Sequence, residues 1–339
     1  MKIPFIWLRI RIGFYFSTAL LRHLEKFVCG HPCPFPSHKD KRAIKSLTLF
    51  FIVEPPTYQI LACYLAASIR EQFGPDVSLI GYCPEHRRPE LDENVVTLLK
   101  RLNCEIRTFK SLGRFDPNYP HGNKILATLE KRSTEYSGFM DSDILCIGPN
   151  RIDSIVNPGC VSLTFAASMN WAPQTIWNDI YRACDMDVPK ERVMLARQRK
   201  GEPKIPYYSS GFVTFPENHL SADGKSFPET WMDIAQIIDA TPDIPHKRPY
   251  LDQMTLPLAI TRAGLKPNLM DERQHFILGG KLRGKPLPED MEILTVHYRR
   301  WLVLKEAQLS GLGKNLLRKH AGVKRVYEVG TDKDSIVKA

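Results

Sequence analysis

Two aspartates, Asp141 and Asp143, stand two residues apart within the run Gly-Phe-Met-Asp-Ser-Asp-Ile-Leu-Cys-Ile. Side chains at this spacing in an extended segment point to one face, so the two carboxylates would share a site. Burying like charges beside apolar residues is unfavourable unless a partner compensates them. A hard divalent cation takes oxygen ligands and keeps positions free for substrate phosphates. The motif therefore predicts a metal site, and the alternative is an Asp-rich turn between strands.

The segments before this motif alternate between strand and helix patterns. Leu47–Val53 is a continuous apolar run followed by two prolines, which is typical of a buried parallel strand. Further strands are expected at 77–83 and 104–109, and helices at 58–73, 90–102 and 123–133. This alternation predicts a mixed, mostly parallel sheet flanked by helices.

The segments after the motif are less regular. Strands are expected at 207–215 and 291–298, and helices at 176–184, 227–238 and 251–263. No internal repeat or low-complexity stretch is found. The organisation we expect is an apolar and basic extension with a linker over residues 1–43, one α/β domain over 44–302 and a basic tail over 303–339.

The chain has 339 residues, of which 43% are hydrophobic, and this favours a globular protein with a large core. Its net charge of +10 is concentrated at the two ends, because residues 1–42 and 299–339 carry +6 each. The rest of the chain has a net charge of −2. Basic ends on a near-neutral body favour contact with an anionic surface over a nucleic-acid groove.

The N-terminal segment is apolar but interrupted by arginines. Its longest uncharged run, Ile12–Leu21, is too short for a membrane span, which needs about 20 residues. A helix lying on an anionic membrane and a helix packed on protein are both compatible with it. Most of the eight cysteines stand in apolar stretches, as expected for reduced core residues of a cytoplasmic protein. The pair Cys29 and Cys33 lacks the spacing of a zinc knuckle.

Six segments in a fixed order resemble the nucleotide-sugar transferases with a GT-A fold, and family 8 of the glycosyltransferases in particular, which includes glycogenin and bacterial lipopolysaccharide hexosyltransferases. The segments are Phe50–Tyr58, Asn123-Lys124, Tyr136–Leu145, Tyr207–Phe215, Leu251–Gln253 and Val296–Tyr298. The resemblance covers about residues 47–301. It implies a GT-A (Rossmann-like) fold and transfer of a hexose from a nucleoside diphosphate sugar.

The resemblance implies a metal site formed by Asp141, Asp143 and His297. These residues would hold Mn²⁺ or Mg²⁺ against the diphosphate, and an imidazole ligand favours Mn²⁺. The ion would act as a Lewis acid toward the departing nucleoside diphosphate.

The resemblance also implies a donor-binding set. Tyr58 would stack on the nucleobase, or else pack on the core. Lys124 would add positive charge near the phosphates or hold the sugar, or else lie in solvent. Ser210 and Gly211 would let the backbone approach the donor sugar, although Gly211 can also simply relieve packing in a strand.

In the family, positions equivalent to Asp252 and Gln253 line the anomeric carbon and the acceptor, which makes both catalytic candidates. Asp252 could instead be a helix N-cap. The segment His297-Tyr-Arg-Arg-Trp departs from the family, because it lacks the usual Gly and Lys-Pro after the histidine. Arg299 or Arg300 could supply the phosphate contact instead, or form an outward basic pair. This departure leaves the stereochemistry open.

The sequence thus predicts a metal-dependent glycosyltransferase that transfers a hexose, with retention, from a nucleoside diphosphate sugar such as a UDP-sugar. The acceptor would be a glycan or a lipid-linked glycan, and contact with an anionic membrane would be peripheral. Two alternatives remain. A sugar-phosphate nucleotidyltransferase would show a Gly-rich phosphate loop after the first strand, and Val53-Glu-Pro-Pro-Thr has none. A non-catalytic binding protein with this fold is the other.

Overall fold

The computed structural model describes residues 46–198, 200–326 and 337–338. The chain divides into two units, Met1–Ala43 and Ile44–Ala339. The predictions made for residues 1–43, including the membrane-facing helix, lie outside the described residues.

A seven-stranded sheet forms the centre of the second unit, in the order β3-β2-β1-β4-β7-β6-β8. Only β7 runs antiparallel to its neighbours. The strands are β1 (Leu47–Ile52), β2 (Ser78–Pro84), β3 (Cys104–Phe109), β4 (Tyr136–Met140), β6 (Cys160–Leu163), β7 (Phe212–Pro216) and β8 (Lys266–Leu269). The mixed, mostly parallel sheet predicted from the sequence is confirmed.

Strand β1 shows why the sheet is covered on both faces. Its residues alternate, so Leu49 and Phe51 enter one hydrophobic core while Phe50 enters another. All three side chains are fully buried. A strand buried on both faces needs a continuous apolar sequence, which is what β1 has.

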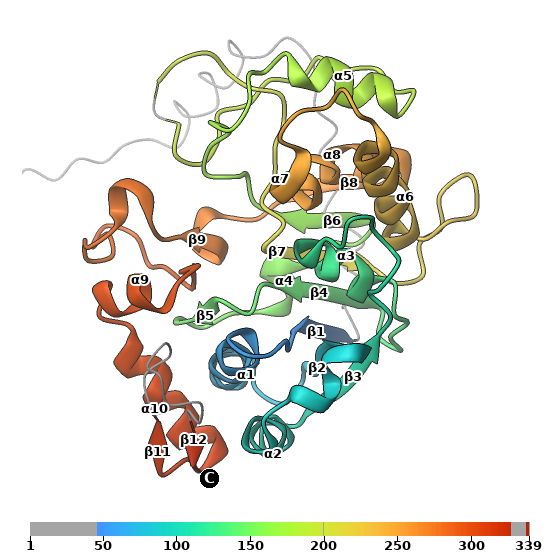
Figure 1. Cartoon of the computed structure of the whole chain (residues 1–339). Coiled ribbons are helices and arrows are strands. Elements are labelled where there is room, and N and C mark those ends of the chain that lie inside the picture. The colour runs from blue at the N-terminus through green and yellow to red at the C-terminus, as the bar shows by residue number, and fades with distance from the viewer. Residues whose placement is uncertain (1–45, 199, 327–336, 339) are drawn as a thin grey trace, which may run out of the picture. The chain divides into compact units, whose positions relative to one another are not determined.

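Helices pack on both faces of this sheet (Figure 1). The helices are α1 (Tyr58–Phe73), α2 (Glu93–Arg101), α3 (Asn123–Thr128), α4 (Ile152–Ile155), α5 (Ile176–Ala183), α6 (Phe227–Ala240), α7 (Lys247–Met254), α8 (Leu256–Arg262), α9 (Trp301–Glu306) and α10 (Ser310–Ala321). Side chains of α1, α2 and α10 belong to the first core, and those of α3, α5, α6 and α8 to the second.

Local signals in the sequence fix several helix starts. Asp92 caps α2, because its carboxylate accepts a hydrogen bond from the Asn94 amide at 2.8 Å. Ser226 and Glu229 form a reciprocal capping box at the start of α6. The helix expected at 251–263 is two helices, α7 and α8, because Pro257 cannot continue a helix from the preceding turn.

A second, smaller sheet lies beside the end of β4 and has the order β5-β10-β9. Its strands are β5 (Ile144–Cys146), β9 (Phe276–Ile277) and β10 (Thr295–His297). The two apolar segments around Asp141 and Asp143 therefore belong to different sheets, and the acidic motif is the connection between them. This connection places the motif at the carboxyl end of β4.

The C-terminal segment expected as a basic tail contains α9 and α10. Gly313 of α10 lies against Tyr64 of α1, and Leu316 and Leu317 are buried in the core that α1 lines. Residues 303–326 therefore pack in the same unit as the sheet. A short pair of strands, β11 (Arg325–Val326) and β12 (Val337–Lys338), follows α10.

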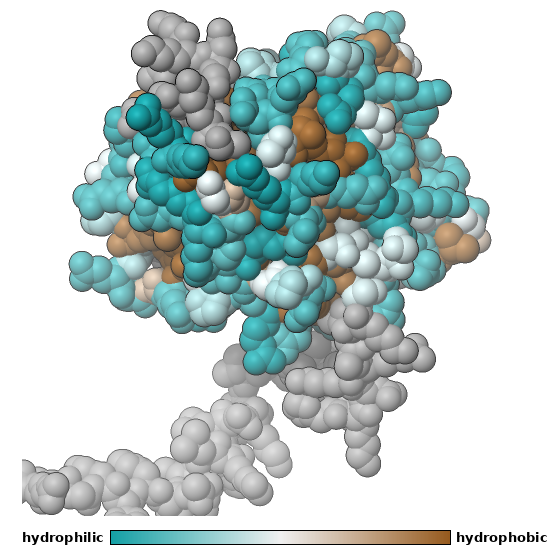
Figure 2. Space-filling view, turned by 90° about the horizontal axis from the view of Figure 1, so that it is seen from below, coloured by the Kyte–Doolittle hydropathy of each residue, from teal (hydrophilic) through white to brown (hydrophobic). Residues whose placement is uncertain are grey.

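The surface seen in Figure 2 is mainly hydrophilic, with hydrophobic residues in separate smaller areas. Within the part of the chain that the structure describes, no helix is both long and apolar enough to span a bilayer. Five of the six described cysteines are buried, and all six are free thiols. Burial raises the pKa of Cys83 to about 11 and that of Cys104 to about 12, so these thiols are unreactive.

Candidate active site

The segment Asp141-Ser142-Asp143 forms a turn at the carboxyl end of β4. The Ile144 amide donates to the Asp141 carbonyl at 3.1 Å, and the Asp141 amide donates to the Gly211 carbonyl at 2.7 Å. The Ser142 hydroxyl donates to the carbonyl of Ile52, the last residue of β1. The extended conformation that the spacing suggested is therefore wrong, although the turn still brings both carboxylates to one side.

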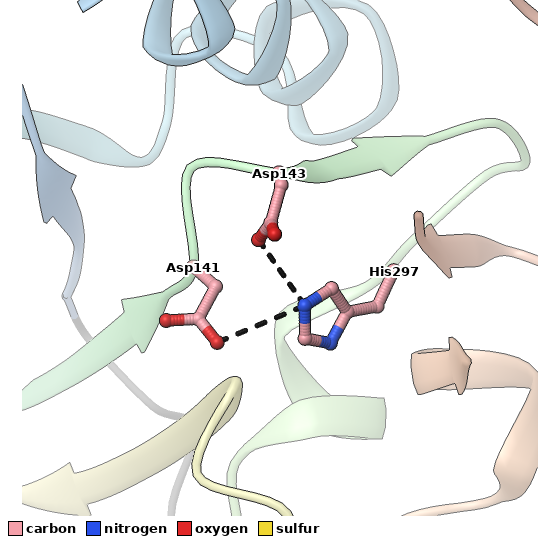
Figure 3. Close-up of side chains that lie close together, drawn as sticks. All are labelled: Asp141, Asp143 and His297. Atoms are coloured by element: carbon pink, nitrogen blue, oxygen red, sulfur yellow. Dashed lines mark ion pairs between the residues drawn. The ribbon is translucent and has the colours of Figure 1, made fainter. Parts of the chain in front are cut away.

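The pairing of β5 with β10 brings His297 to the two aspartates. His297 is the register partner of Ile144, and the Tyr298 amide donates to the Asp143 carbonyl at 3.0 Å. His297 Nε2 lies 3.1 Å from Asp143 Oδ1 and 3.8 Å from Asp141 Oδ2 (Figure 3). One ligand atom from each residue lies within 4.8 Å of the other two, which is the arrangement of a metal site.

The electrostatics of the two aspartates differ. Burial raises the pKa of Asp141 above its ordinary value, and Lys124 opposes this only in part. Burial also acts to raise the pKa of Asp143, but His297 and Lys124 together with a backbone hydrogen bond outweigh it, and the net shift is downward. The negative charge at Asp141 is therefore incompletely compensated. Two carboxylates and an imidazole with such a deficit of positive charge fit a divalent transition-metal ion.

Lys124 connects these residues to the catalytic candidates. Its Nζ lies 2.9 Å from Asp141 Oδ1, 3.0 Å from Asp252 Oδ2 and 3.2 Å from Ser210 Oγ. Burial acts to lower the pKa of Lys124, but the two aspartates raise it overall, so the ammonium stays charged. The structure thus places Lys124 in the buried cluster, and the alternative of a solvated lysine is wrong.

Asp252 lies in the second half of α7, five residues after its first residue Lys247, so the N-cap alternative is also wrong. Its carboxylate is 2% exposed and accepts hydrogen bonds from Tyr119 at 3.1 Å and from the Ser210 hydroxyl. Burial acts to raise its pKa, but Lys124 and Ser210 outweigh burial and lower it. Asp252 is therefore an ionised side chain whose orientation is fixed by three donors.

Gln253 differs from Asp252 in having a free end. Its Oε1 accepts from the Tyr207 hydroxyl at 2.8 Å, and that hydroxyl accepts from Trp171 Nε1 at 3.3 Å. Trp171 in turn stacks on Tyr250, with ring centroids 4.7 Å apart. The amide group of Gln253 is therefore held at its oxygen, while its N–H₂ group makes no hydrogen bond with any of the described residues.

Gly211 is required by the close packing of the metal site. A Cβ at this position would lie 2.9 Å from Asp141 Oδ2 and 3.0 Å from the Cε1 atoms of both His275 and His297. Real Cβ atoms rarely approach other atoms so closely, so any other residue would displace a candidate ligand. Glycine at this position therefore allows the side chains of Asp141, His275 and His297 to lie close to the backbone.

The other three predicted donor-binding residues, Tyr58, Arg299 and Arg300, are exposed. Tyr58 is 47% exposed at the start of α1, and burial together with the charges of Asp143 and Asp141 raises its pKa. Arg299 and Arg300 are exposed and follow the end of β10 by two and three residues. Arg299 lowers the pKa of the buried His275, though burial contributes more. Phosphate binding by either arginine remains a prediction.

His275 belongs to the site but was not identified from the sequence. It is 2% exposed, its Nε2 lies 3.0 Å from Ser209 Oγ, and its ring centroid lies 5.1 Å from that of His297. Burial lowers its pKa well below the ordinary value, so the imidazole is neutral. His275 stands in the irregular segment Glu-Arg-Gln-His-Phe, whose sequence pattern does not indicate its neighbours.

Comparisons with known proteins place the chain among glycosyltransferases. Residues 49–264 match the family model of the Rhodobacterales glycosyltransferase domain. No curated protein sequence matches the chain significantly.

Solved structures similar to this one include two glycosyltransferases. Mouse xyloside xylosyltransferase 1, in its apo form, is 13% identical, with a TM-score of 0.46 over 74% of this chain and 96% of that chain. The galactosyltransferase LgtC in complex with donor and acceptor sugar analogues is 12% identical, with a TM-score of 0.49 over 78% of this chain and 95% of that chain.

The matching family model covers more than half of the chain and includes the acidic motif, Ser210, Gly211, Asp252 and Gln253. The protein therefore belongs to the Rhodobacterales glycosyltransferase domain family. It is an enzyme of the glycosyltransferase class, as the sequence predicted.

Proposed function

We propose that this glycosyltransferase transfers a hexose from a nucleoside diphosphate sugar to a hydroxyl group of a glycan acceptor, with Mn²⁺ as cofactor and with retention of configuration. The observation that carries the proposal is the convergence of Asp141, Asp143 and His297 within 4.8 Å in a chain of this family. A UDP-sugar is the donor we favour, and Mg²⁺ is the alternative metal.

The proposed metal would be held by Asp141, Asp143 and His297. When bound there, the cation supplies Lewis-acid stabilisation of the negative charge on the departing diphosphate. The mixed oxygen and nitrogen donor set favours Mn²⁺ over Mg²⁺, which prefers oxygen ligands.

Lys124, Asp252 and Gln253 would act on the sugar side of the reaction. The fixed negative charge of Asp252 would stabilise positive charge that develops at the anomeric carbon. Lys124 holds Asp252 and Asp141 in one arrangement through contacts of about 3 Å to each. The N–H₂ group of Gln253, which has no hydrogen-bond partner among the described residues, would contact a substrate oxygen.

Tyr58 and the arginines would bind the rest of the donor. The half-exposed ring of Tyr58 offers a face for a nucleobase at the carboxyl edge of β1, where ligands of open α/β sheets bind. Arg299 and Arg300 are exposed and follow His297 by two and three residues, and one of them would pair with a phosphate. The proposed acceptor includes lipid-linked glycans, with residues 1–42 as the contact to an anionic membrane.

A donor panel tests the proposal directly. The purified full chain is incubated with UDP-, GDP-, ADP- and CMP-sugars in the presence of Mn²⁺ or EDTA, and donor hydrolysis and thermal shift are measured. We expect one diphosphate sugar to be bound and slowly hydrolysed only with the metal. Binding without any turnover would favour the non-catalytic alternative, and no binding would contradict the proposal.

A further inference from the structure

A cavity of about 170 Å³ lies next to the candidate active site. Its polar wall includes Thr164, Arg197, Glu272 and His275, and its apolar wall includes Phe165. At roughly 30 Å³ per water molecule, the volume would hold five or six waters. It is comparable to the space that a single sugar ring occupies.

The cavity shares a wall with the proposed metal site. His275 lines the cavity, and its ring lies 5.1 Å from that of His297. A Cβ on Gly211 would approach His275, His297 and Asp141 at once. A ligand in the cavity would therefore lie directly beside the proposed metal ligands.

Three residues that line the cavity each have a buried side-chain atom without a hydrogen-bond partner among the described residues. These atoms are Thr164 Oγ1, Arg197 Nη2 and His275 Nδ1. Thr164 and His275 are only 3% and 2% exposed as whole residues. Buried polar groups are normally hydrogen-bonded, so three such atoms in the residues of one cavity wall favour a polar ligand. These atoms have almost no accessible surface, so their side chains would turn toward the ligand on binding.

The structure holds Arg197 firmly in this wall. Its amide donates to the Ala167 carbonyl at 3.2 Å, and its Nη1 donates to the Gly279 carbonyl at 3.0 Å. Gly279 and Gly280 adopt positive φ angles of 106° and 56°, which form the turn that receives the guanidinium group. The Nη2 atom of this guanidinium group is buried and has no hydrogen-bond partner among the described residues.

Arg197 makes no ion pair with any described residue. Burial lowers its pKa, Arg299 lowers it further, and Glu272 raises it only in part. A half-buried guanidinium group without a carboxylate partner is a receptor for a carboxylate or phosphate, which it can bind through two parallel hydrogen bonds.

We propose that this cavity binds an acidic sugar residue of the acceptor, with its carboxylate or phosphate on Arg197 and its hydroxyl groups on Glu272 and Thr164. The inference rests on the proposed function only in assigning the sugar to the acceptor. The guanidinium group of Arg197, the carboxylate of Glu272 and the ring of Phe165 together match a sugar ring that carries hydroxyl groups and one negative charge.

Calorimetric titration of the full chain tests this inference. The probes are methyl glucuronide, glucose 6-phosphate and neutral methyl glucoside, each added with Mn²⁺ and UDP present. We expect at least one acidic sugar to bind at least about 10-fold more tightly than the neutral one. Equal binding of the acidic and neutral probes, or no binding of either acidic probe, would overturn the proposal.

Matched variants locate the binding site. Arg197→Gln should weaken binding of the acidic sugar at least about 10-fold, while Arg192→Gln, at an exposed arginine five residues earlier, should not change it. Glu272→Gln should tighten binding, because it removes a negative charge from the wall. Glu272→Gln keeps the test decisive if Arg197→Gln does not fold, because unchanged or weaker binding of the acidic sugar by this variant would overturn the proposal.

A separate titration with UDP and Mn²⁺ distinguishes the source of the anion. Unchanged UDP binding by Arg197→Gln would support an acceptor site, and an equal loss of UDP binding would assign the arginine to the donor diphosphate and overturn the proposal. Titration of the acidic sugars without nucleotide or metal tests the cavity even if the proposed donor reaction fails.

Discussion

Strand β4 has a buried charged cluster at each end, and the two clusters differ in how their charges are balanced. Near its start, Arg132 pairs one to one with Glu217, and the Ser137 hydroxyl bonds to both. Beyond its end, three aspartates, Asp141, Asp143 and Asp252, share one lysine and one histidine.

In the cluster near the start of β4, the charge of Arg132 is balanced by that of Glu217. The Arg132 side chain is 0% exposed, and it donates to the Ala127 carbonyl at 3.1 Å and the Thr128 carbonyl at 2.8 Å. Its guanidinium carbon also lies 4.3 Å from the centre of the Phe50 ring. The cluster beyond the end of β4 has an excess of negative charge. A balanced buried pair is structural, and a buried excess of charge indicates a ligand of opposite sign.

The largest effect is expected from breaking the balanced pair. Arg132→Met leaves Glu217 buried without its partner, so the free energy of unfolding should fall by about 3–5 kcal/mol. Urea denaturation at pH 7 measures this. The double variant with Glu217→Leu should recover part of the loss, because it removes the unpaired charge. A loss below about 1 kcal/mol for the single variant would show that the pair is not the structural element we describe.

The second largest effect is expected from removing one negative charge from the cluster beyond the end of β4. Asp143→Asn should reduce metal-dependent donor turnover about 100-fold, equivalent to about 2.7 kcal/mol, because it removes a proposed metal ligand. The free energy of unfolding of the metal-free protein should fall slightly, because the lowered pKa of Asp143 shows that the fold stabilises its ionised form. The control is Asp76→Asn, at an exposed position before β2. Full activity of the Asp143 variant with an unchanged manganese requirement would contradict the metal assignment.

A smaller effect is expected from the metal itself. Mn²⁺ at ten times its dissociation constant should raise the free energy of unfolding by about 1.4 kcal/mol, because it binds the folded state alone. The shift should persist in Arg132→Met and vanish in Asp143→Asn. Thermal unfolding with Mn²⁺ and with EDTA provides the comparison. A shift that persists in Asp143→Asn would place the ion elsewhere.

The smallest effect is expected at an exposed cluster between α1 and α10. Glu71 pairs with Lys319 at 2.7 Å and contacts His320, and these hydrogen bonds lower the pKa of Glu71. Its contribution is therefore present above the unfolded pKa and is lost as pH falls through the folded value. Glu71→Gln should cost less than about 1 kcal/mol at pH 7. Denaturation of both proteins at pH 7 and pH 3 should show that the difference disappears in acid.

Much of the sheet could be predicted from the sequence, because parallel strands buried on both faces leave continuous apolar runs. The strand at Cys104–Phe109 and the helix at Tyr58–Phe73 have the predicted bounds. The predicted strand 207–215 was less accurate, since β7 begins at Phe212. Residues 207–211 instead take part in contacts of the candidate active site. Ser210 donates a hydrogen bond to Asp252, and Asp141 lies close to the backbone of Gly211.

The acidic motif could be predicted because its two carboxylates are neighbours in sequence and lie between apolar segments. The bridge that Lys124 makes between Asp141 and Asp252 could not, because it joins three distant segments through side chains. Arg197 and His275 were also missed. Both lie in segments without a regular pattern, and their partners are determined by the packing of the folded chain.

The pairing of β5 with β10 has a consequence for the order in which the protein matures. The pairing brings His297 to the aspartates, although His297 follows its register partner Ile144 by 153 positions in the sequence. On a ribosome, which delivers the N-terminal part first, a chain that has formed β4 and β5 still lacks its third ligand. The complete metal site can therefore form only late in synthesis, after nearly the whole domain has been made.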